Sequence, residues 1–243
     1  MLGANSGAFY NSLITPIIDE GKHLVNLSIL FLHYKTLEGA HGLEITESMA
    51  LTIALQACLP ILNLGIDWYD GWTSVIVHPT QYFSDRTEVD AAGVHHQSRN
   101  VLSGESWHRG PVVLAWDQTE HAAIIDGDNL VVHEFAHKLD ILNGDTNGFP
   151  PLHADMDVKE WTDIMSRAFA HFRMQITQGN GLPINGYAAT SPAEFFAVLC
   201  EVFFERGDIL QHFYPDVYTE FKVFFRQDPM GGAHSSSLGD TEN

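Results

Sequence analysis

Residues 129–144, NLVVHEFAHKLDILNG, place polar groups on a segment that is otherwise apolar. His133 and His137 are four residues apart, and Glu134 follows the first histidine directly. In a helix the two imidazoles lie one turn apart on the same face, while the apolar residues between them require burial on the other faces. The fold must therefore bury a helix that carries two histidines and a carboxylate, and must give those groups partners.

The ends of this helix are marked in the sequence. Asn129 can accept a hydrogen bond from the first helical turn, so we predict a helix from there to about Leu142. Gly144 follows at the position where a left-handed glycine commonly ends a helix.

The rest of the chain has mainly helical patterns. Apolar residues at helical spacing predict further helices over 23–39, 46–60, 158–176 and 191–205, and residues 217–229 close the folded part. The helix of 191–205 has a capping-box start, because Ser191 precedes a proline and Glu194 comes three residues later.

Short strands complete the prediction. Residues 72–79 and 111–116 are rich in β-branched and aromatic residues, and Pro111 at the start of the second suits an edge strand. Residues 83–110 are polar and contain glycine, so we predict a long surface segment there. The expected fold class is α+β, mainly helical, with a small sheet beside the helix of 129–142.

Domain organisation follows from the absence of repeats and linkers. We expect a single domain over residues 23–229, a separate N-terminal segment over 1–22, and a disordered tail over 230–243, where small and polar residues dominate.

Charge limits the classes of partner. The chain has 12 Lys and Arg against 31 Asp and Glu, a formal net charge of −19. Such a surface repels phosphate backbones and anionic lipids, so we expect no direct nucleic-acid or membrane binding. The longest apolar-rich stretch, 49–66, is interrupted by polar residues and Pro60, so we predict no membrane span.

The two cysteines indicate the compartment. Cys58 and Cys200 each lie inside an apolar run, which predicts buried free thiols and a reducing environment. No basic and then apolar export signal stands at the N-terminus, and we therefore expect a cytoplasmic protein.

The H-E-x-x-H spacing predicts metal chemistry. Zinc accepts imidazole nitrogens at about 2.0–2.1 Å, and a glutamate between the histidines can take a proton from the attacking water. With 14 His and 14 Glu in 243 residues, roughly 0.05 accidental matches are expected. The alternative is a pair of buried histidines that are satisfied without a metal.

A catalytic zinc also needs a third protein ligand and an open position. The downstream carboxylates Glu194, Glu201 and Glu205 share one face of the helix of 191–205. Glu194 has a competing role in the capping box, so the residues alone leave the third ligand open between Glu194 and Glu201. Asp140 lies on the histidine face in the last turn, where an acid opposes the helix dipole, and we expect it to orient a ligand histidine.

Four segments carry a family resemblance: residues 43–72, 104–116, 131–153 and 186–198. Within them HEFAHKLD and YAATSPAEFFAV are the most telling motifs. They resemble the Mlc titration factor A family of bacterial zinc-dependent peptidases, and the similarity runs from about residue 24 to residue 229.

This resemblance implies roles for the site residues. His133, His137 and Glu194 would bind one Zn²⁺, which leaves Glu201 to support a ligand from behind. Glu134 would be the general base, and Tyr187 would donate a hydrogen bond to the oxyanion. The implied fold is related to the gluzincin catalytic domain of anthrax lethal factor.

The resemblance also implies an activity and a partner. Members of the family are described as cytosolic, aminopeptidase-like enzymes that act on short peptide substrates. They are also described as binding the Mlc repressor of the glucose system and so relieving repression of sugar uptake. An extended substrate would suit strand addition beside residues 111–116.

Two departures from the family pattern stand out. Residues 1 to about 20 do not resemble the usual start, and Asn185-Gly186 replaces an acidic residue and a proline. The second change is predicted to loosen the turn beside Tyr187 without removing a functional group.

Two rival functions are a protein-binding regulator with a structural or vestigial zinc site, and a metallohydrolase that does not act on peptides. The presence of Glu134 favours a peptidase over both, because a structural site needs no base and H-E-x-x-H is strongly biased to peptide hydrolysis.

Overall fold

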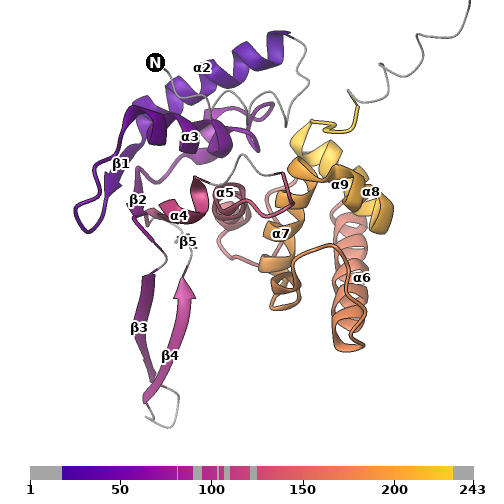
Figure 1. Cartoon of the computed structure of the whole chain (residues 1–243). Helices are drawn as coiled ribbons and strands as arrows, with labels where there is room; N and C mark the ends of the chain where they lie inside the picture. The colour runs from indigo at the N-terminus through magenta and orange to yellow at the C-terminus, as the bar shows by residue number, and fades with distance from the viewer. Residues whose placement is uncertain are drawn as a thin grey trace, which may run out of the picture.

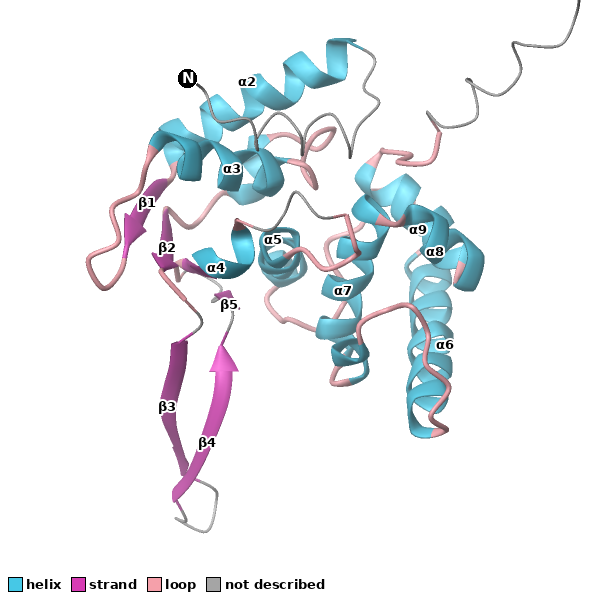
Figure 2. Cartoon of the chain, viewed as in Figure 1, coloured by secondary structure: helices cyan, strands magenta, loops and turns pink. Residues whose placement is uncertain are grey.

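The computed structural model describes residues 18–80, 82–89, 95–102, 104–106, 110–120 and 125–231. Helices dominate the described part, and a small sheet lies to one side of them (Figures 1 and 2). The predicted mainly helical α+β class is confirmed. Of the two end segments, residues 1–17 and 232–243 lie outside the described residues, and the single domain over 23–229 stays a prediction.

Two helices form the N-terminal layer, α2 (Ile18–Tyr34) and α3 (Glu47–Cys58), and they pack against each other. The side chain of Thr46 caps α3 as predicted, by accepting the N–H of Met49 at 3.2 Å. Helix α2 ends at Tyr34, so the prediction that it reaches Gly39 is wrong.

Lys35 accounts for the early end of α2. Its side chain is buried, and Nζ donates to the carbonyl oxygens of Tyr69 and Trp72 at 2.5 and 2.6 Å. The chain then continues as strand β1 (Thr36–Gly39), which pairs with β2 (Ser74–His78). Tertiary pairing with β2 therefore overrides the local helical pattern.

The sheet has the order β1-β2-β6-β5, with β6 at Val112–Ala115 and β5 at Gly104–Ser106. Strands β1, β2 and β6 are parallel, and β5 is antiparallel to β6. The two predicted strands are confirmed, but the prediction that the second is an edge strand is wrong. Pro111 lies just before the paired residues of β6, so its missing N–H removes no hydrogen bond from the sheet.

A hairpin replaces much of the predicted surface segment. Strand β3 (Tyr82–Val89) pairs antiparallel with β4 (His95–Leu102) and extends away from the helices (Figure 1). The prediction missed these strands because their sequence has no clear alternation of apolar and polar residues.

Helix α5 (Leu130–Asp140) lies at the centre of the molecule, packed against α3, the sheet and α7 (Pro192–Glu205). Helices α6 (Val158–Thr177) and α9 (Pro215–Phe225) lie beyond α7, and α8 (Gly207–Phe213) joins α7 to α9 (Figure 1). The helices predicted over 129–142, 158–176 and 191–205 are confirmed.

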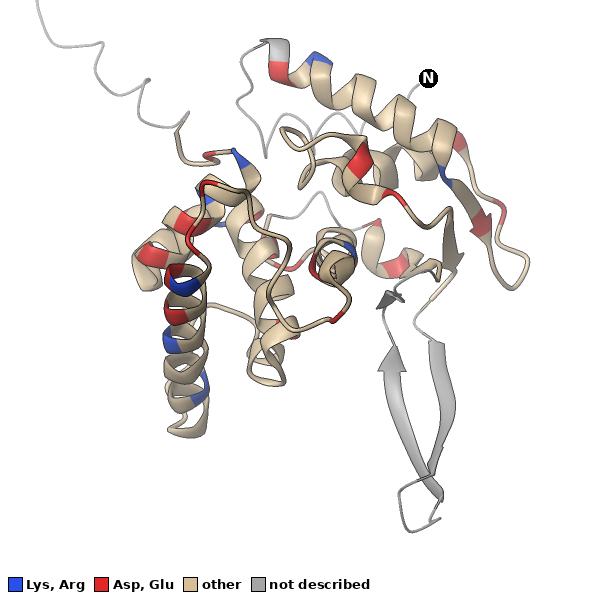
Figure 3. Ribbon diagram, turned by 180° about the vertical axis from the view of Figure 1, so that it is seen from behind, with Lys and Arg blue, Asp and Glu red and all other residues tan. Residues whose placement is uncertain are grey.

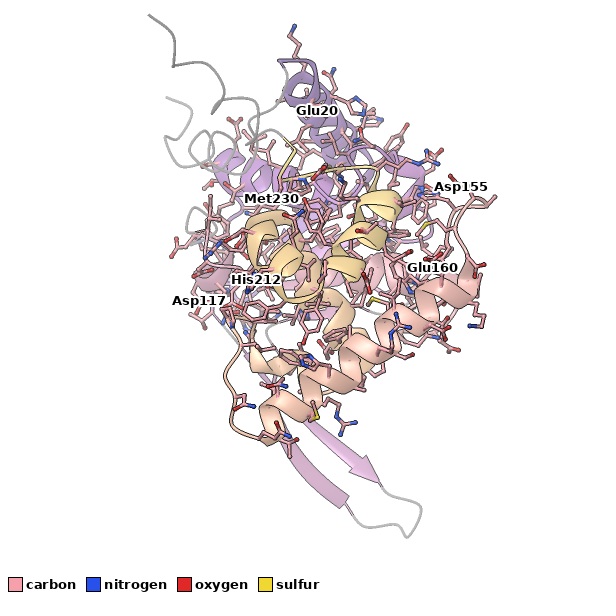
Figure 4. All side chains as sticks on the ribbon, turned by 90° about the vertical axis from the view of Figure 1, so that its right-hand side faces the viewer. Glu20, Asp117, Asp155, Glu160, His212 and Met230 are labelled. Carbon is pink, nitrogen blue, oxygen red and sulfur yellow. The ribbon has the colours of Figure 1, made fainter. Side chains whose placement is uncertain are left out.

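Aromatic side chains fill the core on both sides of this centre. One group packs behind α5, namely Phe31, Tyr69, Trp72 and Phe135. A second group joins α6, α7 and α9, and Figure 4 views the molecule from that side. Cys58 and Cys200 are buried and free, as predicted.

Candidate metal centre

Helix α5 carries the histidines and begins as predicted. The side chain of Asn129 accepts the N–H of Val132 at 3.0 Å. After the helix a short 3₁₀ turn leads to Gly144, which has φ of 112°. This left-handed conformation is why glycine suits the position.

His133 and His137 lie one turn apart and face the same side. Their ring centroids are 4.8 Å apart and the rings are nearly perpendicular, at 85°. Their side chains are only 12% and 11% exposed, so solvent satisfies little of their hydrogen-bonding capacity.

Glu194, in the first turn of α7, completes the cluster. Its Oε2 lies 3.1 Å from Nε2 of His133 and 3.4 Å from Nε2 of His137. Tetrahedral ligands at about 2.0–2.1 Å from a zinc ion lie about 3.3 Å from one another. The spacing of the three atoms therefore fits a metal ion, and among the described residues this is the group that could hold one.

Only the backbone N–H of Glu194 takes part in the cap of α7, and its carboxylate does not. Ser191 Oγ accepts the Glu194 N–H at 3.2 Å, as the capping-box pattern predicts. The Glu194 carboxylate instead faces the two histidines, whose influence outweighs burial and lowers its pKa to about 2. The side chain is thus an anion directed at both imidazoles.

Glu201 lies on the opposite side of His133. Nδ1 of His133 donates to Glu201 Oε1 at 2.7 Å, and the other carboxylate oxygen accepts the N–H of Asn129. A proton on Nδ1 leaves the lone pair on Nε2, the nitrogen that faces Glu194. Glu201 is therefore placed to support a ligand, and Glu194 to be one.

His133 would otherwise hold a proton. Burial lowers its pKa, but Glu194 and Glu201 together raise the pKa well above its usual value. A metal ion at Nε2 can take the place of that proton, because ligand histidines must be neutral and the metal supplies the positive charge.

Glu134 is buried beside the cluster. The residue is 3% exposed, and Oε2 makes no hydrogen bond within the described part of the chain. Burial raises its pKa, while His133 and His137 act in the opposite direction. Such an oxygen can accept a proton from a water molecule at the centre.

Asp140 does not orient a histidine. Its carboxylate accepts the N–H groups of Gly148 and Phe149, each at 2.8 Å, and burial raises its pKa to about 6. Nδ1 of His137 is buried without a hydrogen-bond partner in the described structure. The prediction that Asp140 orients a ligand histidine is therefore wrong. Asp140 instead fixes the loop that follows α5.

Tyr187 lies beside His133, in the 3₁₀ turn Gly186–Ala189. It is 52% exposed, and its ring centroid is 6.2 Å from that of His133. Burial, and then the charges of Glu194 and Glu134, raise the pKa of its hydroxyl. The hydroxyl therefore stays protonated and can donate at neutral pH.

Asn185 holds the turn that carries Tyr187. Its Oδ1 accepts the Tyr187 N–H at 3.0 Å, and its Nδ2 donates to Asp128 at 2.9 Å. Asn185 thus forms two bonds in this turn, and Gly186 does not have a left-handed φ. The loosening of the turn relative to the family pattern stays a prediction.

Sequence reasoning missed Lys138 and the partners of Glu205. Lys138 is 1% exposed and donates to the Gly110 carbonyl oxygen at 2.8 Å, directly before the chain enters β6. A lysine among buried positions of α5 was the available signal. The Glu205 carboxylate accepts hydrogen bonds from Gly127 and Asn129, which lie just before α5. These residues are far from Glu205 in the sequence, so only the tertiary structure brings them into contact.

The chain is similar in sequence to known proteins. The family described as Glucose-regulated metallo-peptidase M90 matches residues 8–226 of the 243-residue chain. The chain belongs to the M90 metallopeptidase family. The match includes part of segment 1–22, and among the described residues of this M90 member His133, His137 and Glu194 are the candidate metal-binding group.

Relatives of this M90 protein carry the name Mlc titration factor A. The chain is 38% identical to the one from Klebsiella pneumoniae (strain 342) over 226 aligned residues. The alignment covers 92% of this chain and 85% of the relative. It is 35% identical over 232 residues to the one from Escherichia coli (strain 55989 / EAEC), covering 94% and 88%. The predicted family is confirmed.

Within the described ranges, no helix is both long and apolar enough to cross a bilayer. Acidic residues are spread over the described part, whereas several of its Lys and Arg lie on α6 (Figure 3).

Proposed function

We propose that the chain is a zinc-dependent peptidase that acts in an aminopeptidase-like way on short peptides, with one zinc held by His133, His137 and Glu194. The observation that carries the proposal is the approach of both histidine Nε2 atoms to one Glu194 oxygen, at 3.1 and 3.4 Å. Two histidines and a glutamate form a ligand set of catalytic zinc sites, which leave a position open.

When bound, zinc would polarise the peptide carbonyl and make a water molecule more acidic. Glu134 takes a proton from that water at its buried Oε2, which has no partner among the described residues, and passes it to the leaving amine. As the water oxygen bonds to the carbonyl carbon, Tyr187 donates a hydrogen bond from its hydroxyl to the carbonyl oxygen, where negative charge develops before the bond to the leaving amine breaks. Glu201 keeps the His133 Nε2 lone pair directed at the centre.

The prediction that an extended substrate adds as a strand beside β6 is wrong, because β2 and β5 already pair with both of its edges. Strand β5 is the edge strand on the side that contacts α5, so we place the extended peptide along β5 instead.

We also propose that the protein binds an Mlc-type repressor in the cytoplasm. The name of its relatives supports the partner, and identities of 35–38% over more than four fifths of each chain support the transfer. Two free, buried cysteines are compatible with a reducing compartment. The alternative is a regulator of that repressor in which the metal is structural or vestigial.

An assay on amino-acid p-nitroanilides and short peptides, paired with metal analysis, tests the proposal. We expect one zinc per chain, activity that chelation removes and zinc restores, and loss of both metal and activity in His137→Ala. Binding to an Mlc-type repressor with no hydrolysis by zinc-loaded protein would favour the regulator. A His137→Ala protein that keeps one zinc would refute the ligand set.

A further inference from the structure

A short segment behind the metal centre, Gly127–Asn129, is held by two carboxylates of α7. The Gly127 N–H donates to Glu205 Oε2 at 3.0 Å, and Asn129 Nδ2 donates to Glu205 Oε1 at 2.8 Å. The Asn129 N–H donates to Glu201. Both oxygens of Glu205 are thus used to fix this segment, and the side chain is buried.

Asn129 links this segment to the histidine helix. Its Oδ1 caps α5 through the Val132 N–H, and its own N–H holds the Glu201 oxygen that does not face His133. The orientation of Asn129 therefore sets both the start of α5 and the direction of the Glu201 carboxylate. Glu205 fixes that orientation by accepting from Nδ2.

The same segment reaches the tyrosine on the other side of the centre. Asp128 accepts from Asn185, whose Oδ1 accepts the N–H of Tyr187. Residues 127–129 thus lie between the helix that carries the histidines and the turn that carries the proposed oxyanion donor.

We propose that Glu205 is a positioning residue of the metal centre, which acts through Asn129 and Glu201 on the orientation of His133. The proposal deepens the proposed function and rests on His133 being a metal ligand.

The chemistry of the contacts explains why an acid stands here. A carboxylate accepts from two separate N–H donors, whereas a glutamine offers one acceptor oxygen and turns an NH₂ group toward the other donor. The surroundings of Glu205 disfavour its charged form. Burial, with Glu201 and Asp126 nearby, raises the pKa of Glu205 to about 7, and Asn129 and Gly127 act in the opposite direction.

The test compares Glu205→Gln with Asn129→Ser and with the matched control Glu220→Gln on α9. Serine also caps helices well, so Asn129→Ser keeps the start of α5 and removes the donor to Glu205. Each protein is measured for Zn²⁺ affinity by chelator competition, for the visible spectrum of its Co²⁺ form, for kcat at saturating zinc, and for thermal stability.

We expect Glu205→Gln to bind zinc about tenfold more weakly and to have an altered Co²⁺ spectrum, since loss of an outer partner of a ligand costs about 10–100-fold. Asn129→Ser should change the same two readouts, and the double variant should be less than additive, because both changes break one contact. Glu220→Gln should match the wild type.

A Glu205→Gln protein with wild-type zinc affinity, Co²⁺ spectrum and kcat, and only a lower melting temperature, would overturn the proposal. If Glu205→Gln does not fold, Asn129→Ser decides by the same criteria. Zinc affinity and the spectrum need no substrate, so an inactive wild type would refute the peptidase proposal while these readouts still judge Glu205.

Discussion

Helix α7 has two buried faces of opposite character. Glu194, Glu201 and Glu205, spaced by seven and four residues, face α5 and its approach segment. Phe196 and Phe203, also seven residues apart, lie on the other face and pack against aromatic rings of α6 and α9.

The two faces differ in what they contribute to folding. Burying one large apolar side chain contributes about 1.5–3 kcal/mol, and an aromatic pair adds about 0.5–1.5 kcal/mol. On the opposite face, burial raises the pKa of both Glu201 and Glu205, which shows that their charged forms are disfavoured there. The aromatic face thus stabilises the packing of α7, whereas the carboxylate face places Glu194 and Glu201 against His133.

The sharpest test of this comparison lies at the start of the carboxylate face. Glu194→Gln removes the anionic donor, and we expect loss of stoichiometric zinc and of all measurable activity. Glu201→Gln should keep zinc and lose about 10–100-fold in affinity or activity. Metal analysis after dialysis separates them, and the reverse ranking would make Glu201 the ligand.

Glu134→Gln tests the base on the facing helix. The substitution keeps the shape of the side chain and removes its proton acceptor, so turnover should fall about 10²–10⁴-fold while zinc stays bound. Loss of zinc together with turnover would show that Glu134 is a ligand.

Tyr187→Phe tests the hydroxyl of the half-exposed tyrosine beside His133. We expect kcat to fall by about 10²–10³ with KM nearly unchanged, because the donor acts when charge develops on the substrate oxygen. Zinc content and melting temperature should stay as in the wild type. Normal kcat with reduced stability would leave Tyr187 a packing residue.

Phe203→Ala probes the aromatic face. Its ring contacts those of Tyr218, Phe221 and Phe225, with centroids 5.3–5.7 Å away, and the residue is fully buried. The unfolding free energy should fall by about 3–5 kcal/mol, with zinc affinity and kcat of the folded enzyme unchanged. Denaturant unfolding and kinetics on one preparation check both, and a large loss of kcat in folded protein would contradict the division between faces.

The smallest expected effect concerns pH. Because the pKa of Glu205 is raised to about 7 in the folded state, that state holds the proton more tightly than the unfolded chain does. Its contribution to stability is therefore greatest in acid and falls as pH rises toward 7. The stability difference between wild type and Glu205→Gln should shrink from pH 5 to pH 8 in urea unfolding of zinc-free protein, and a constant difference would contradict the raised pKa.

The sequence by itself determined much of the local structure. Asn129, Ser191 and Gly144 end or begin helices as predicted, because caps and left-handed positions depend on near neighbours. The spacing of His133 and His137 places them on one face for the same reason. The family motifs also pointed to Glu194 and Tyr187, which spacing alone left open.

Only the tertiary structure decided which distant groups meet. The contact of Glu194 with both histidines, and that of Glu205 with Gly127, join residues more than fifty positions apart. The same holds for Asp140, which binds backbone N–H groups of the following loop, and for β6, which has neighbours on both sides. Hydrogen-bond partners across elements depend on how helices and strands pack, and a periodic pattern in the sequence shows which face is polar but not what that face will meet.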